Sequence, residues 1–129
     1  MNQKNLLLII LLGIIVSSSS GCAALLVGGG AGAGTIAYLK GDLRSLEEAS
    51  LQRVWEAAQK AIQELEFVVT SKQKDIFSAK LIAHGAQDKK VTVNLKKISD
   101  NLTEIKIRVG IFGDESLSRL LLERVRKHL

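Results

Sequence analysis

The feature that most constrains this chain is an uncharged apolar run close to its N-terminus, from Leu6 to Val16. Lys4 precedes the run, and the small residues Ser17–Gly21 follow it. A positive charge, a short apolar stretch and small residues, in that order, are typical of a secretory signal peptide. The run is shorter than the roughly 20 residues that a membrane-spanning helix needs. We therefore predict that residues 1–21 are a signal peptide.

The chain contains a single cysteine, Cys22, which directly follows these small residues. One cysteine excludes an intramolecular disulfide. The residues Ser19-Ser20-Gly21-Cys22 resemble a bacterial lipobox, although Ser19 stands where lipoboxes usually have leucine. The resemblance implies cleavage between Gly21 and Cys22, a diacylglycerol thioether on the Cys22 sulfur and acylation of the new amino group. An ordinary signal peptide with an incidental cysteine is the alternative.

The residue after Cys22 bears on where such a protein is delivered. Two or more acyl chains give stable membrane attachment, since each buried methylene contributes about 0.8 kcal/mol. In the lipoproteins that this segment resembles, a residue other than aspartate after the cysteine permits export to the outer membrane, and Ala23 stands there. The resemblance implies a protein anchored in the cell membrane or outer membrane, with its remaining chain on the periplasmic side.

Residues 23–39 carry no charge and include the glycine-rich run Gly28–Gly34. The segment is either a flexible tether or a membrane-proximal helix, in which glycines four residues apart let another backbone approach closely. The apolar residues around the run favour the helix, with Tyr38 and Lys40 at its interfacial end. A phosphate-binding loop is disfavoured, because no strand precedes the run and no Lys-Ser or Lys-Thr follows it. We assign residues 22–43 to this segment.

Residues 44–129 have the patterns of a folded domain that begins with a helix. Ser45 and Glu48 have the spacing of a capping box. Apolar residues then recur at intervals of three and four between Leu51 and Leu65. The spacing predicts one apolar helix face.

Alternation of apolar and polar residues follows this helix. It runs over residues 77–84, 91–96 and 104–109, with a short β-branched run near Phe67. Turn residues separate the last three segments, at Gly85–Asp88 and Ser99–Asn101. Short connections require antiparallel neighbours, so we predict a meander of three to four strands.

A second helix is predicted from Asp114 onward, with an apolar stripe that includes Leu117, Leu121 and Val125. Basic residues crowd its end, where positive charge suits the helix dipole. Both helices need a surface to cover, and the aliphatic face of the meander provides one. The sequence therefore predicts an α+β two-layer sandwich in the order α-β-β-β-β-α.

The stretch Ile107–Glu115, which leads into the last helix, is distinctive. Together with the lipobox and the glycine-rich run, it resembles an uncharacterised family of small bacterial lipoproteins that is classed as a domain of unknown function. The resemblance implies no activity, and Cys22 is the only functional residue that it transfers.

The residues offer little for catalysis. The only histidines, His84 and His128, lack metal-ligand spacing, and a thioether at Cys22 is no nucleophile. The carboxylates of Asp114 and Glu115 are explained by a helix N-terminus. We predict no enzyme, no cofactor and no metal, and expect no small-molecule substrate. Aromatic residues are 4% of the chain, too few for a base-stacking surface, and an exported protein rarely meets nucleic acid.

Basic residues alternate with the apolar ones in the predicted strands: Lys80, Lys96, Lys106 and Arg108. Near a membrane such a face would attract anionic head groups, at about 1 kcal/mol per residue. The same lysines also suit an ordinary solvated face that resists edge pairing. Two functions stay open. One is an envelope module that binds a protein partner, or itself through the glycine-rich segment. The other is a module that binds anionic lipid or polymer through the basic face.

Overall fold

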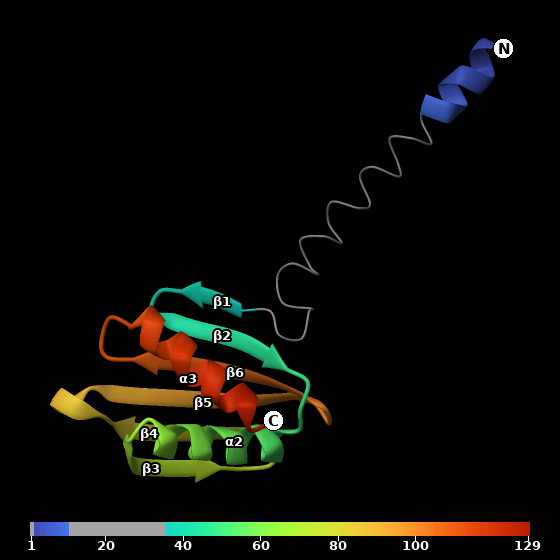
Figure 1. The fold of residues 1–129 in the computed structure, drawn as a ribbon. Helices are drawn as coiled ribbons and strands as arrows, with labels where there is room; N and C mark the ends of the chain where they lie inside the picture. Colours follow the sequence, from blue (N-terminus) through green and yellow to red (C-terminus); the bar gives the residue numbers. More distant parts are fainter. Residues whose placement is uncertain (1, 11–35) are drawn as a thin grey trace. The chain divides into compact units, whose positions relative to one another are not determined.

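The structure is a computed structural model that describes residues 2–10 and 36–129 (Figure 1). It divides into two compact units, residues 1–32 and 33–129. Residues 3–10, in the first unit, are helical. None of the helices in the described ranges is long and apolar enough to cross a membrane. Every buried hydrophobic residue of the described chain lies in the second unit, so we expect residues 33–129 to fold alone.

The second unit is built on one antiparallel sheet of six strands in the order β1-β2-β6-β5-β4-β3. Two helices lie on one side of the sheet (Figure 1). The helices are α2 (Leu51–Glu64) and α3 (Glu115–Lys127). The strands are β1 (Ile36–Leu39), β2 (Asp42–Glu47), β3 (Val68–Lys74), β4 (Ser78–His84), β5 (Lys90–Ser99) and β6 (Leu102–Val109).

The core lies between the sheet and the two helices. Alternate residues of the central strands are fully buried there, including Leu81, Val93 and Ile107. Helix α2 connects β2, next to one edge of the sheet, to β3 at the other edge. Its N-cap is Ser50, whose Oγ accepts from the backbone N–H of Arg53 at 3.3 Å. Asp114 caps α3 in the same way.

The predicted α+β class with antiparallel strands is confirmed, but the strand count and the element order are wrong. The sheet has six strands, and two of them precede α2. The predicted capping box at Ser45 and Glu48 is wrong as well, because Ser45 lies within β2 and α2 begins six residues later. The domain boundary predicted at residue 44 therefore falls inside a strand.

The structure also corrects the end of the predicted glycine-rich helix. Ile36–Leu39 is edge strand β1 and pairs with β2 across a turn at Lys40 and Gly41. Tyr38 lies in this strand and packs against the core. Residues 22–35 of that segment lie outside the described residues, as does Gly21 of the predicted cleavage site.

Strand β2 was missed because its inward positions are partly polar. Leu43, Ser45 and Glu47 all point into the core. Ser45 Oγ donates to Glu47 Oε1 at 2.7 Å. Arg126 of α3 completes the network, with Nε 3.0 Å from Glu47 Oε1 and Nη2 2.9 Å from Ser45 Oγ. Since each buried polar atom has a partner, the strand tolerates polar residues on its inner face.

We predict that Arg126→Met destabilises the domain, because it leaves the Glu47 carboxylate buried without its cation. The expected loss in the free energy of unfolding is about 2 kcal/mol or more. Urea denaturation of residues 33–129 measures it. Lys127→Met, at an exposed position of the same helix, is the matched control. Equal losses in the two variants would contradict the role of the network.

Acid should weaken the domain partly through the N-cap of α3. The backbone N–H of Leu117, with help from Lys89, lowers the pKa of Asp114 below its usual 3.8. A carboxyl group whose pKa is lower in the folded state stabilises the fold above its unfolded pKa, and this contribution is lost as the pH falls through the folded value. Asp114→Asn keeps the capping oxygen but does not titrate. Between about pH 5 and about pH 2 the parent should therefore lose more stability than the variant. If the urea midpoints of the parent and the variant fall by the same amount across this range, the assignment is refuted.

Candidate ligand-binding face

The sheet face opposite the two helices is left open, and its outward side chains form continuous rows across the strands. One row follows the strand register through β2, β6, β5, β4 and β3. We call it the basic row, and its members in that order are Arg44, Lys106, Asn94, Lys80 and Gln73. Every member is a hydrogen-bond donor, and three of them are cations.

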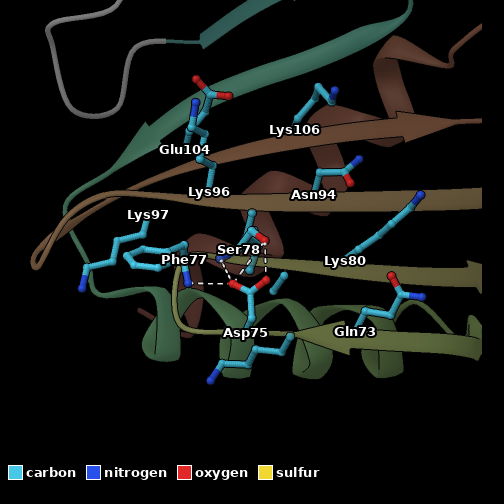
Figure 2. A pocket seen from close by; sticks show the side chains of 13 residues that line it. Gln73, Asp75, Phe77, Ser78, Lys80, Asn94, Lys96, Lys97, Glu104 and Lys106 are labelled. Atoms are coloured by element: carbon cyan, nitrogen blue, oxygen red, sulfur yellow. Dashed lines mark hydrogen bonds between the residues drawn. The ribbon is translucent and has the colours of Figure 1, made fainter.

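A second row lies beside it, where Lys96 of β5 is in register with Glu104 of β6 and Ser78 of β4. The two rows border a depression of about 700 Å³, shown in Figure 2. The β3–β4 turn closes one side of the depression with Asp75 and Phe77. Polar and cationic side chains therefore surround a hollow that neither helix covers.

The depression is electropositive. Its lining contains five lysines (Lys74, Lys80, Lys96, Lys97 and Lys106) and two carboxylates (Asp75 and Glu104). Lys97 is paired with Asp100 at 3.2 Å. Within the described ranges, no ion pair holds Lys80, Lys96 or Lys106. These three ammonium groups keep their charge available to an external anion.

Asp75 is committed to the turn that carries it. Its carboxylate accepts the backbone N–H groups of Phe77 at 2.7 Å and Ser78 at 2.9 Å. These bonds lower the pKa of Asp75 below its usual value, and the bond from Phe77 contributes most. The charge is used within the turn, which positions Phe77 and Ser78 at the rim of the depression.

Three of the four basic residues predicted from the sequence lie together here, and Arg108 does not. Its guanidinium is 3.0 Å from Asp42 Oδ1, and it also donates to the carbonyls of Lys40 at 3.0 Å and Ile111 at 2.6 Å. Arg108 therefore joins two turns and is not available as a ligand-binding cation. Sequence reasoning missed Arg44, which alternation with Leu43 and Ser45 would have shown had β2 been recognised.

The other sequence candidates lie apart from the depression or outside the described residues. His128 Nε2 lies 2.5 Å from Glu64 Oε1, on the helix side. His84 Nδ1 lies 3.3 Å from Asp88 in the loop after β4. In the part of the chain that the structure describes, no three His, Cys, Asp or Glu side chains are grouped to hold a metal ion. Gly21 and Cys22 are not among the described residues.

The geometry suits recognition of oxyanions. Lysine ammonium groups and the amide N–H groups of Asn94 and Gln73 donate to phosphate, carboxylate or sulfate oxygens. Neighbouring strands lie about 4.8 Å apart, so the basic row extends over about 19 Å. A row of that length matches an extended polyanion or several head groups better than one small ion.

Comparison with known proteins places the chain in a family without assigning an activity. No match to a curated protein was found. A model of a family described as "protein of unknown function (DUF3568)" matches residues 5–128, which is nearly the whole chain. The predicted membership of an uncharacterised family is thus confirmed, and the chain belongs to DUF3568.

Proposed function

We propose that this protein is a lipid-anchored module of the bacterial envelope, without catalytic activity, that binds an anionic ligand through its open sheet face. The observation that carries the proposal is the position of Lys80, Lys96 and Lys106 beside one uncovered depression. None of the three forms an ion pair with a described residue. The ligand is an anionic lipid surface or an anionic polymer, both of which offer rows of oxyanions.

The anchoring half of the proposal rests on the N-terminal sequence. A charge, an apolar run, small residues and the only cysteine follow one another in the order that lipidation requires. The family match begins at residue 5 and so includes the apolar run and Cys22. Cleavage before Cys22 and acylation would hold the domain on the periplasmic side of the cell membrane or outer membrane.

The binding half rests on charge and on the strand register. Lys106 and Lys80 lie two strands apart, with Asn94 between them, and their side chains leave the sheet on the same side. The negative charges of Glu104 and Asp75 offset only part of the positive charge of the lysines at the depression. Near a membrane the effective concentration of head groups is high, so even a modest attraction per lysine produces binding.

Anchoring predicts a specific mass. The mature chain should start at Cys22 and carry the mass of its acyl groups, whereas Cys22→Ser should be neither cleaved there nor acylated. Mass spectrometry of the protein purified from membranes measures both properties. Ser17→Ala, within the same small-residue stretch, is the control and should mature normally. An intact Met1 or a free thiol on Cys22 would refute anchoring.

Face binding predicts a charge-specific loss. The fragment 33–129 should bind phosphatidylglycerol vesicles or polyphosphate, and added salt should weaken the binding. Lys80→Glu/Lys106→Glu should lower the affinity by about tenfold or more, since each cation near a surface contributes about 1 kcal/mol. Lys60→Glu/Lys127→Glu changes the net charge equally, but at exposed positions of α2 and α3. Equal losses in the two double variants would refute the assigned ligand. Capture of an acidic protein, with binding to neither vesicles nor polyphosphate, would also refute it.

A further inference from the structure

One corner of the sheet exposes large apolar side chains to an unusual degree. Ile111 and Phe112, consecutive in the loop between β6 and α3, are 82% and 90% exposed. Leu39, at the end of β1 and next to the β1–β2 turn, is 63% exposed. We call these three residues the apolar corner. Single exposed apolar residues are common, but a neighbouring pair exposed this fully indicates a contact surface.

The corner is held in place by its backbone. Gly41 and Gly113 both have positive φ, and a Cβ on Gly113 would lie 2.4 Å from Gly41 Cα. A Cβ on Gly41 would lie 2.6 Å from the Phe112 carbonyl oxygen. Arg108 bonds the carbonyls of Lys40 and Ile111 and so joins the same two turns. The apolar side chains are therefore presented outward from a close-packed backbone support.

The charges around the corner favour an anionic surface. Its three carboxylates are already paired: Asp42 with Arg108 at 3.0 Å, Asp114 with Lys89 at 2.9 Å and Glu115 with Arg119 at 3.0 Å. Lys40 lies in the β1–β2 turn, and the carbonyl of Lys90 accepts from the N–H of Gly110 at 2.7 Å. Both lysines are exposed. Apolar side chains flanked by lysines are what the interface of an anionic bilayer attracts.

The corner lies beside β1, the strand that follows the segment leading from Cys22. Strand β1 has four residues, so its two ends are only about 10 Å apart. Residues 23–35, between Cys22 and β1, span at most about 45 Å when extended. The exposed pair Ile76 and Phe77 lies instead at the β3–β4 turn, next to the opposite edge strand. The corner thus lies nearer along the sheet to β1, where the chain enters the sheet, than the Ile76–Phe77 pair does.

We propose that Ile111 and Phe112 insert into the lipid bilayer to which Cys22 is attached, so that the domain docks by the corner formed from β1 and the β6–α3 loop. The inference rests on the anchoring of the proposed function and not on the basic row. It gives the membrane a second point of contact, which orients the open sheet face.

Tryptophan quenching tests the insertion. The full chain, purified from membranes, is reconstituted in phosphatidylcholine–phosphatidylglycerol vesicles whose acyl chains carry bromine, a contact quencher of tryptophan. Phe112→Trp should be quenched and should emit at shorter wavelength than in detergent-free buffer. Gln63→Trp, at an exposed position of α2 on the helix side of the sheet, should not be quenched. The parent chain, measured in the same way, gives the fluorescence of Trp55, which is 9% exposed, and this signal is subtracted.

The outcomes separate the inference from the anchoring on which it rests. The mass of the reconstituted chain reports acylation in the same sample, so missing acyl groups would count against anchoring alone. Phe112→Trp that is quenched no more than Gln63→Trp would overturn the insertion. A shift to shorter wavelength without quenching by bromine would also overturn it, because the side chain would then be covered by protein, a second copy included.

Discussion

Two helices cover one face of a six-stranded sheet, and the rest of the structure depends on this one-sided cover. The residues that point toward the helices are aliphatic and almost fully buried, as Val93 and Ile107 are. The residues that alternate with them have no layer to pack against and must be compatible with water. Lysine, threonine and asparagine fill these positions, so the same alternation that makes the core also makes the electropositive face.

The basic residues fall into two groups that differ in chemistry. Arg108 and Arg126 use their guanidinium forks to bridge several acceptors, and each joins elements that are far apart in the sequence. Lys80, Lys96 and Lys106 of the open face form no ion pair with a described residue, although Lys97 pairs with Asp100. A guanidinium offers several donors in a fixed plane and suits structural bridging, whereas an ammonium on a flexible stem suits a mobile or variable anion. The division supports the assignment of the lysines, and not of Arg108, to a ligand.

Much of the fold was predictable because local patterns agree with it. Strands β4, β5 and β6 follow strict alternation, and α3 begins at its predicted cap, Asp114. Strands β1 and β2 were missed for a physical reason. Glu47 is a buried carboxylate whose cation, Arg126, is 79 residues away, and no local window shows that such a position is interior. Ser45 and Glu48 then imitated a helix cap, although Ser50 forms the real one.

The amino-acid sequence by itself determined the order of charge, apolar run and cysteine at the N-terminus, the α+β class and the outward placement of Lys80, Lys96 and Lys106. These properties depend on residues close together in the chain. Only the tertiary structure decided which cations remain without an ion pair and which turns meet at the apolar corner. Arg108 reaches Asp42 across 66 residues, and Gly113 meets Gly41 across a similar distance. Such contacts arise from strand register, which brings together residues whose sequence separation carries no sign of their proximity.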